Sequence, residues 1–321
     1  MYLPRSVSVF IPTYNGRVDL ERVLPRLFEQ QVAFPFEVVC IDSSSSDGTW
    51  ELLGRFPLRR ERILQSEFNH GATRNKGIAL CRGEIVVLLT QDALPLGREW
   101  LATIIANYAD PDVAGVYCRQ VARPDGTLLP QIDLRLAQNG RARRAENRLS
   151  DHPEYPALPP DARRELCNFD DICSSVRRSV WERFPFEPLR FAEDLAWGKQ
   201  VFEAGFTLVY EPLAQVQHSH DRSFGYEFKR AFVSNKVLDD FFGRGDDKLR
   251  FMPAVLSLRH APSNLVGVYS EFAREPWARR MRCYYVILAR GLGRVFFNFW
   301  FRHFRGTRFG DWLVARLHSG V

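Results

Sequence analysis

Short apolar runs alternate with amphipathic stretches along the first 120 residues. Apolar and β-branched runs predict strands at 7–12, 36–41, 62–65, 84–89 and 113–117, of which 62–65 has the weakest pattern. Apolar residues at helical spacing predict helices at 18–30, 47–56, 71–81 and 98–108. Strands that alternate with helices indicate βαβ units, so we expect an α/β fold with a mainly parallel central sheet flanked by helices.

The pattern changes in the second half of the chain. Residues 135–165 are rich in Arg, Ala, Asn and Pro, and they predict a helix followed by a long surface connection. Strand and helix patterns return at 172–176, 195–204 and 206–210. From Ser223 onward the pattern is mostly helical. The sequence therefore predicts a first domain over residues 1–221 and a helical C-terminal region over residues 222–321.

Composition narrows the class of protein. The 321 residues are 45% hydrophobic and 26% charged, which excludes disordered and collagen-like chains. Six cysteines without a CxxC pair argue against a disulfide scaffold and a structural zinc site. Cys40 lies in an apolar run, so we expect a free buried thiol in a reducing compartment. No signal-peptide pattern and no apolar run of spanning length is present, so no membrane-spanning helix is predicted.

The net charge of +6 is unevenly spread. Residues 1–221 carry 26 Lys+Arg and 30 Asp+Glu, a balance of −4, whereas residues 222–321 carry 18 and 8, a balance of +10. Such a basic region suits an anionic membrane surface, a nucleic acid or a phosphorylated acceptor. Arg290, Arg294, Asn298 and Arg302 form a polar stripe on a mostly apolar helix. That helix either lies in a membrane interface or packs on the first domain or on a second subunit.

Polar loops follow four of the predicted strands, at 12–15 (PTYN), 42–49 (DSSSSDGT), 68–71 (FNHG) and 90–93 (TQDA). In an open parallel sheet, ligands bind outside the carboxyl ends of the strands, so we expect these loops to meet in one crevice. Each loop alone also fits a turn or a helix cap. No GxGxxG or GxxxxGK[ST] is present, which disfavours a Rossmann dehydrogenase and a P-loop NTPase. A phosphate ligand would then need a metal ion or arginines, and Asp92 and Arg74 are the candidates.

These motifs resemble those of family 2 glycosyltransferases, inverting sugar-nucleotide enzymes of the GT-A fold, over residues 6–242. Six segments are similar to the bacterial rhamnosyltransferase branch of that family: HGATRN (70–75), TQDA (90–93), RQ (119–120), SVRRSVW (175–181), EDLAW (193–197) and HSH (218–220). The resemblance implies a GT-A catalytic domain with a nucleotide-sugar half over about residues 1–117 and an acceptor half over about residues 118–221, followed by a helical extension.

The resemblance also implies where the nucleotide sugar binds. Asp42 would accept a hydrogen bond from the pyrimidine, and Arg74 would hold the nucleotide near the diphosphate. Asp92 matches the last acidic position of the DxD metal motif, but Thr90 replaces its usual first Asp, so diphosphate oxygens would supply most ligands of a Mg²⁺ or Mn²⁺ ion. The remaining expected donor-site residues are Pro12, Thr13, Tyr14, Asn15, His70, Gly71 and Gln91.

For the acceptor side, the resemblance makes Asp194 the general base, with Glu193 positioning the acceptor. An acidic pair at a helix N-terminus also stabilises the helix electrostatically, so Glu193 and Asp194 have either a catalytic role, this structural role or both. His218 or His220 would face the metal or the diphosphate. Other residues expected near the acceptor or the sugar are Arg119, Gln120 and Trp197. Trp197 is either a platform on which a sugar stacks or a core residue. Asp170 and Asp171 either contact the acceptor or are solvated.

The expected function is inverting transfer of L-rhamnose from dTDP-L-rhamnose to a hydroxyl of a surface polysaccharide or lipid-linked oligosaccharide. The expected location is the cytoplasm, either free or peripheral on the inner face of the plasma membrane. Another UDP- or dTDP-sugar donor and a non-catalytic sugar-nucleotide sensor are alternatives. A nucleic-acid-binding protein is the third, but no recognised nucleic-acid motif is present, so no nucleic-acid partner is expected. A homo-oligomer would follow if the C-terminal helix packs on a second subunit.

Overall fold

The computed structural model describes residues 4, 6–124, 134, 138–220, 222–243 and 276–318. The chain divides into two compact units. The N-terminal unit comprises Met1–Pro124, Asp133–Leu158 and Arg163–Ser219, and the C-terminal unit comprises Asp125–Ile132, Pro159–Ala162 and His220–Val321. Part of the predicted connection at 135–165, and residues 244–275 of the predicted helical region, lie outside the described residues. The division of the first domain into donor and acceptor halves stays a prediction.

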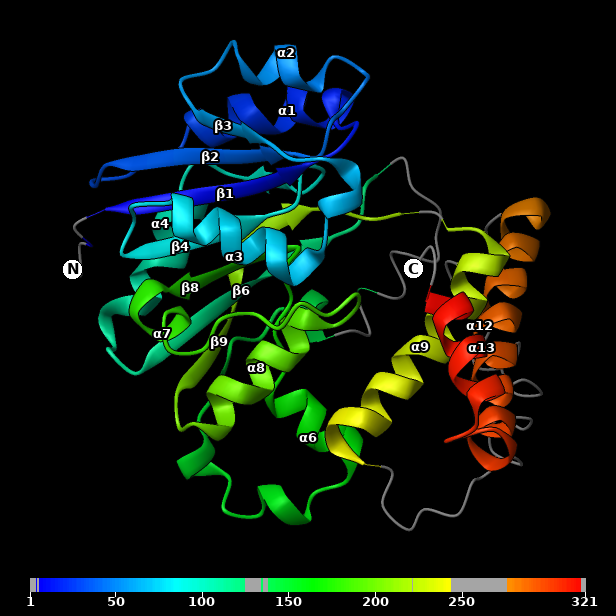
Figure 1. The fold of residues 1–321 in the computed structure, drawn as a ribbon. Helices are drawn as coiled ribbons and strands as arrows, with labels where there is room; N and C mark the ends of the chain where they lie inside the picture. The colour runs from blue at the N-terminus through cyan, green and yellow to red at the C-terminus, as the bar shows by residue number, and fades with distance from the viewer. Residues whose placement is uncertain are drawn as a thin grey trace. The chain divides into compact units, whose positions relative to one another are not determined.

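The N-terminal unit is built on a mixed sheet whose described strands run in the order β3-β2-β1-β4-β8-β6-β9-β5, with β7 also pairing with β9 (Figure 1). The predicted parallel block consists of β1 (Val7–Thr13), β2 (Phe36–Asp42), β3 (Arg59–Arg62) and β4 (Ile85–Leu89). β8 (Cys173–Arg177) is antiparallel to both β4 and β6 (Val113–Val121). β9 (Thr207–Gln217) is parallel to β6. Two short strands, β5 (Leu94–Leu96) and β7 (Ala145–Asn147), are antiparallel to β9.

Helices connect and flank these strands, as the sequence predicts. Their bounds are α1 (Arg17–Phe28), α2 (Thr49–Leu53), α3 (His70–Leu80), α4 (Trp100–Ala106), α6 (Pro160–Leu166), α7 (Arg178–Trp181) and α8 (Glu193–Glu203). Within the described residues, single-turn 3₁₀ segments lie at Gln65–Glu67, Asn107–Ala109, Gln138–Gly140, Leu149–Asp151 and Tyr155–Ala157. On α1 the apolar face is buried in the core, which explains why its spacing gives a clear helical pattern.

Strand β3 shows where the sequence pattern misleads. The predicted strand at 62–65 actually lies at Arg59–Arg62, with the sequence RRER. It pairs only with β2 and forms the edge of the sheet, where charged side chains are common because they oppose edge-to-edge association. Arg60 and Arg62 place their guanidinium groups 4.1 and 4.2 Å from the centre of the Trp50 ring. The strand therefore carries no apolar alternation that periodicity could detect.

The core of the N-terminal unit contains buried side chains from β1, β2 and β4 and also from β6, β8 and β9. All six cysteines are free and buried, in agreement with the predicted buried thiol at Cys40. Helix α3 lies close to β1, because a Cβ atom on Gly77 would lie 2.2 Å from the Phe10 ring. This close approach holds the C-terminal half of α3 against β1.

The described part of the C-terminal unit contains α9 (Phe224–Phe242), α12 (Trp277–His303) and α13 (Arg308–His318). Helices α9 and α12 pack through aromatic rings, with Phe232 in contact with Phe297 and Trp300. The Arg290 Nε atom lies 2.7 Å from Oε2 of the buried Glu227. Over the described ranges, no helix is long and apolar enough to cross a membrane.

Candidate active site

Three of the four predicted polar loops are joined by hydrogen bonds. The Tyr14 N–H donates to Gln91 Oε1 at 2.9 Å, and Gln91 Nε2 donates to the Tyr14 carbonyl at 3.0 Å, which joins the loops after β1 and β4. Asn15 has a left-handed backbone with φ of 45°, and its N–H donates to Ser45 Oγ at 2.8 Å. The Ser46 N–H donates to Asn15 Oδ1 at 2.9 Å, which joins the loop after β2. The loops after β1, β2 and β4 therefore meet at the carboxyl ends of the strands, where hydrogen bonds hold them together.

Asp42 organises the loop after β2 from a fully buried position. Its carboxylate accepts hydrogen bonds from Thr13 Oγ1 at 3.1 Å, from Ser45 Oγ at 2.6 Å and from the Ser45 N–H at 3.0 Å. The Arg62 Nε atom lies 3.5 Å from Asp42 Oδ2. A pyrimidine would have to displace one of these partners, and its contact with Asp42 stays a prediction. Pro12 pairs with Ile41 inside the same parallel ladder.

The fourth loop, after β3, is anchored to the segment that leads into α8. Asn69 caps α3, because its Oδ1 accepts a hydrogen bond from the Ala72 N–H at 2.9 Å. Its Nδ2 donates to the carbonyls of Pro188 and Leu189, both at 3.2 Å. A Cβ atom on Gly71 would lie 2.0 Å from the Glu187 carbonyl oxygen, so only glycine permits this approach. The exposed ring of His70 lies edge-on to Phe68.

Arg74 lies at the centre of a buried charge cluster. Its Nη1 donates to Glu193 Oε1 at 2.6 Å, and its Nε lies 2.9 Å from Asp171 Oδ2. Burial alone would lower the pKa of Arg74, but the Asp171 and Glu193 carboxylates outweigh it and hold the pKa above its usual value. A buried guanidinium between two carboxylates fixes the positions of both. The predicted contact of Arg74 with the diphosphate stays a prediction.

Asp194 sits in the first turn of α8, next to this cluster. The residue before the helix, Ala192, has a left-handed backbone with φ of 62°. Asp194 is half-buried, and its Oδ2 accepts a hydrogen bond from the Asp171 N–H at 3.4 Å. Burial raises the pKa of Asp194 well above its usual value, and Glu193 and Asp171 raise it further, whereas Arg74 opposes the rise. A carboxyl with a raised pKa and partial exposure is suited to take a proton from a bound group.

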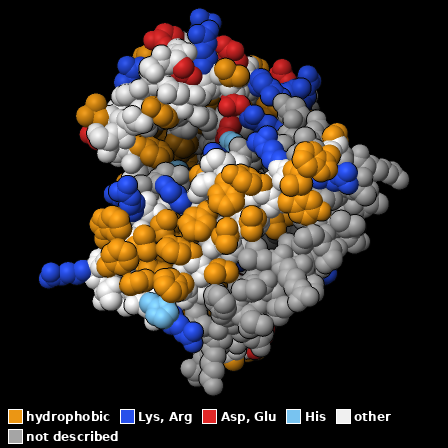
Figure 2. Space-filling view, turned by 90° about the vertical axis from the view of Figure 1, so that its right-hand side faces the viewer, with side chains coloured by type: hydrophobic (Ala, Val, Ile, Leu, Met, Phe, Trp, Pro, Cys, Tyr) orange, Lys and Arg blue, Asp and Glu red, His pale blue; other side chains and the backbone are white. Residues whose placement is uncertain are grey.

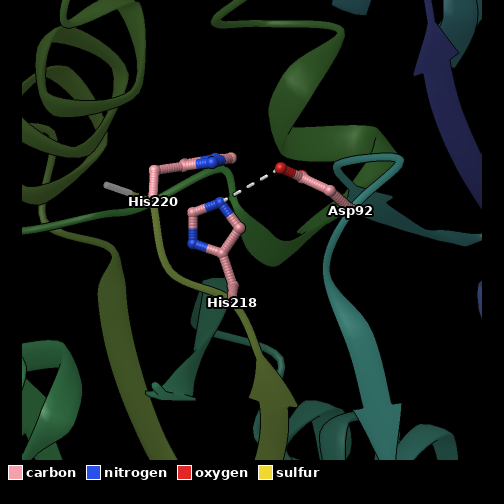
Figure 3. A group of neighbouring side chains, drawn as sticks. All are labelled: Asp92, His218 and His220. Carbon is pink, nitrogen blue, oxygen red and sulfur yellow. Dashed lines mark ion pairs between the residues drawn. The ribbon is translucent and has the colours of Figure 1, made fainter. Parts of the chain in front are cut away.

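Asp92, His218 and His220 point toward one another (Figure 3). Each offers one ligand atom, and the three atoms lie within 4.8 Å of one another. Asp92 follows β4 and His218 follows β9, and the His218 Nε2 atom lies 3.6 Å from Asp92 Oδ2. His220 is only two residues further along the chain, so chain continuity keeps it beside His218. One carboxylate and two imidazoles form a donor set that fits a divalent metal ion.

Gln120 fixes the orientation of His218. The Gln120 Nε2 atom donates to Asp170 Oδ2 at 2.8 Å, so the amide oxygen faces His218 Nδ1 at 3.1 Å. An amide oxygen can only accept, and this assigns the imidazole hydrogen to Nδ1. The Nε2 lone pair then faces Asp92, in the direction required of a metal ligand.

The same contacts join the metal-ligand group to the acidic cluster. Asp170 and Asp171 are adjacent in the chain, Gln120 binds the first, and Asp194 accepts from the backbone of the second. A continuous series of contacts therefore runs from Asp92 to Asp194. The structure thus links the two carboxylates through named contacts, and their catalytic roles stay predictions.

Two residues expected near the acceptor have partners within the protein. Trp197 is fully buried, its indole Nε1 donates to the Phe184 carbonyl at 2.8 Å, and its ring stacks with Phe186. Trp197 therefore lies in the core, and its contact with a sugar stays a prediction. Arg119 donates from Nε to the Gly140 carbonyl at 3.1 Å.

Sequence reasoning missed two supporting residues. Asn139 donates to Asp170 Oδ2 at 2.6 Å, and Ser174 donates to Asp171 Oδ1 at 2.7 Å. Ser174 lies three residues after Asp171, a local spacing that could have been noticed. Asn139 is 31 residues from its partner, and no sequence pattern marks it.

Residues 8–180 match the family described as "Glycosyl transferase family 2". The chain is 30% identical over 270 residues to the O-antigen chain rhamnosyltransferase WbaN of Salmonella anatum, with coverage of 80% of this chain and 82% of the relative. It is 28% identical over 274 residues to the O-antigen chain rhamnosyltransferase RfbN of Salmonella typhimurium, with coverage of 80% and 83%.

The fold is similar to those of solved glycosyltransferases. The mannosyltransferase PcManGT from Pyrobaculum calidifontis, solved with GDP-Man and Mn²⁺, aligns with a TM-score of 0.58 at 20% identity and covers 94% of this chain and 89% of that chain. TarS of S. aureus, residues 1–349, solved with UDP, aligns with a TM-score of 0.53 at 16% identity, with coverage of 92% and 91%. The GT-A fold expected from the sequence is confirmed.

Asp171 gives a pH dependence that can be measured. Burial raises its pKa from 3.8 to about 7, with Arg74 opposing and Glu193 adding to the rise. Between these two values the folded protein holds a proton that the unfolded chain releases, so the free energy of unfolding should fall as the pH rises from about 4 to about 7. Asp171→Asn should flatten this part of the profile, measured by urea unfolding at several pH values. Asp112→Asn removes an exposed carboxylate and is the control; an unchanged slope in Asp171→Asn would contradict the assignment.

Proposed function

Because the chain belongs to glycosyltransferase family 2, we propose that it transfers L-rhamnose with inversion from dTDP-L-rhamnose to a hydroxyl of a surface polysaccharide or lipid-linked oligosaccharide. The observation that carries the choice of sugar is the similarity to two O-antigen rhamnosyltransferases over 80% of this chain and more than 80% of each relative. Similarity over this length extends well beyond the residues of the predicted nucleotide-sugar half.

Asp194 acts as the general base. Its half-buried carboxylate, with a raised pKa, takes the proton of the acceptor hydroxyl as that oxygen attacks the anomeric carbon. Glu193 points to Arg74 and is held there, so it positions the start of α8 and leaves Asp194 to meet the acceptor. One base on the face opposite the leaving group is sufficient for a single displacement, which inverts the anomeric configuration. No covalent sugar intermediate is required.

Asp92, His218 and His220 would hold the divalent cation. A bound cation would neutralise the negative charge of the nucleoside diphosphate leaving group. Gln120 supports this role because it presents the Nε2 lone pair of His218 toward Asp92. Two imidazoles favour Mn²⁺ over Mg²⁺, since Mg²⁺ prefers oxygen ligands. Thr90 leaves one carboxylate in this loop, so the diphosphate oxygens of the donor would supply the remaining ligands.

The donor is tested by a panel of nucleotide sugars. With Mn²⁺ present, dTDP-L-rhamnose should bind at least about tenfold more tightly than dTDP-glucose, UDP-glucose, UDP-GlcNAc or GDP-mannose, measured by calorimetry. Release of free dTDP should follow when membranes that carry lipid-linked saccharides are added. Tighter binding of a UDP- or GDP-sugar would replace the proposed donor, and binding without release under all conditions would favour a sugar-nucleotide sensor.

Asp194→Asn should remove the base and keep the shape of the site. We expect the transfer rate to fall by about 10²–10⁴-fold while the affinity for dTDP is unchanged, since Asp194 does not touch the nucleotide in the proposed geometry. The measurements are dTDP release and dTDP calorimetry on the same protein. Asp151→Asn, which alters an exposed acid, should match the wild type in both. A variant at Asp194 that retains transfer would exclude this residue as the base.

Asp92→Ala should abolish the part of dTDP affinity that depends on the metal. In the wild type, dTDP should bind more tightly with Mn²⁺ than with a chelator, and in Asp92→Ala the two affinities should be equal, because the carboxylate that links cation and protein is lost. Manganese binding followed by electron paramagnetic resonance gives a second readout that does not depend on turnover. Equal wild-type affinity with and without chelator would refute the metal role.

A further inference from the structure

Helix α12 carries a row of exposed apolar side chains. Of the twelve large hydrophobic side chains that are exposed in the described residues, eight lie on α12 and α13. Those on α12 recur every three, four or seven positions and therefore share one face of the helix. They are Trp277, Met281, Tyr285, Leu288, Leu292 and Phe299.

The opposite face of α12 is already packed within its own unit. Cys283, Val286, Ala289, Phe297 and Trp300 are buried. Gly293 lies so close to α9 that a Cβ atom there would be 2.4 Å from the Phe228 carbonyl oxygen. The helix thus has two apolar faces, and the contacts with α9 account for only one of them.

Helix α13 extends the exposed apolar surface. Phe309 and Trp312 are each about half exposed and stack with ring centres 5.7 Å apart. Figure 2 shows hydrophobic side chains gathered in a band on this face, with Lys and Arg side chains at its margins. We call the exposed residues of α12 named above, together with Phe309 and Trp312, the apolar band. Exposed apolar areas of this kind mark sites of interaction.

Charge identifies the partner. The sequence of α12 contains six arginines and no acidic residue, and residues 222–321 carry a net charge of +10, from 18 basic and 8 acidic residues. A second copy of the helix on the same face would bring these like charges together, at a cost in free energy. An anionic lipid surface instead complements them. The band is rich in Trp, Tyr and Phe, the residues that favour the boundary between lipid headgroups and acyl chains.

We propose that the apolar band docks on a membrane that contains anionic lipids, with the axis of α12 in the plane of the interface and the exposed Arg282, Arg294 and Arg302 at the headgroups. This is independent of the proposed sugar donor and of the base, since it uses no residue of the active site. Each arginine near such a surface adds to the attraction, which salt screens. The apolar side chains supply the rest by entering the headgroup region.

Vesicle sedimentation with the full chain tests the proposal. Phosphatidylcholine vesicles with about 30% phosphatidylglycerol should carry the protein down, while pure phosphatidylcholine should bind it at least about tenfold less well. Raising the salt to about 0.5 M should weaken binding to the anionic vesicles. The double variant Leu288→Asp/Leu292→Asp should reduce partitioning by at least about tenfold, because it places two negative charges in the centre of the band.

A matched control is available on the N-terminal unit. Leu213 is 76% exposed, so Leu213→Asp makes the same chemical change away from the band and should leave vesicle binding unchanged. Thermal unfolding and dTDP affinity should be the same in all three proteins, which separates loss of docking from loss of fold or of donor binding. Equal vesicle binding by wild type and double variant would overturn the proposal. The proposal would also be overturned if light scattering showed that the wild type is a dimer and the double variant a monomer, because the band would then contact a second copy of the chain.

Discussion

The ion pairs of Arg74 with Asp171 and Glu193 are the constraint on which the rest of the site depends. They join three separate pieces of chain, namely helix α3, the loop before β8 and the first turn of α8. Removing one partner of such a buried group leaves uncompensated charge, with a typical cost of about 3–5 kcal/mol. The position of Asp194 follows, since it is the next residue after Glu193 and also accepts from the backbone of Asp171. An arginine expected at the nucleotide is thus first of all the residue that holds the acidic cluster together.

The side chain of Gln120 connects the acidic cluster to the metal-ligand group. Its amide has two ends, and one binds Asp170 while the other binds His218. The carboxylates around Asp194 and the ligand group around Asp92 consequently share one hydrogen-bonded partner. A shift of either group is transmitted to the other through a single side chain, because both hydrogen bonds have to be kept to satisfy the amide. The ligand group around Asp92 and the acidic cluster around Asp194 are therefore linked by polar contacts as well as by the sheet.

Sequence reasoning succeeded where one local pattern determines the structure. The polar loops after β1, β2 and β4 follow apolar strands, so their meeting at one edge could be predicted, and Tyr14, Asn15 and Gln91 do meet there. It failed where the pattern has two physical explanations or none. Trp197 fits both a sugar platform and a core position, and its burial in the core becomes known only from the structure. The charged strand β3 carries no alternation, and the partnership of Asn139 with Asp170 depends on tertiary folding that no spacing records.

The reversed direction of β8 has a consequence for how the cleft is assembled. In a wholly parallel sheet, a loop that precedes a strand opens on the edge remote from the ligand. Because β8 runs against its neighbours β4 and β6, its first residue, Cys173, lies opposite Leu89, the last residue of β4. The residues just before β8, Asp170 and Asp171, therefore lie beside the residues that follow β4. One inverted strand thus places residues that precede a strand and residues that follow a strand at the same edge of the sheet, which offers a greater variety of chemical groups than strand ends alone could supply.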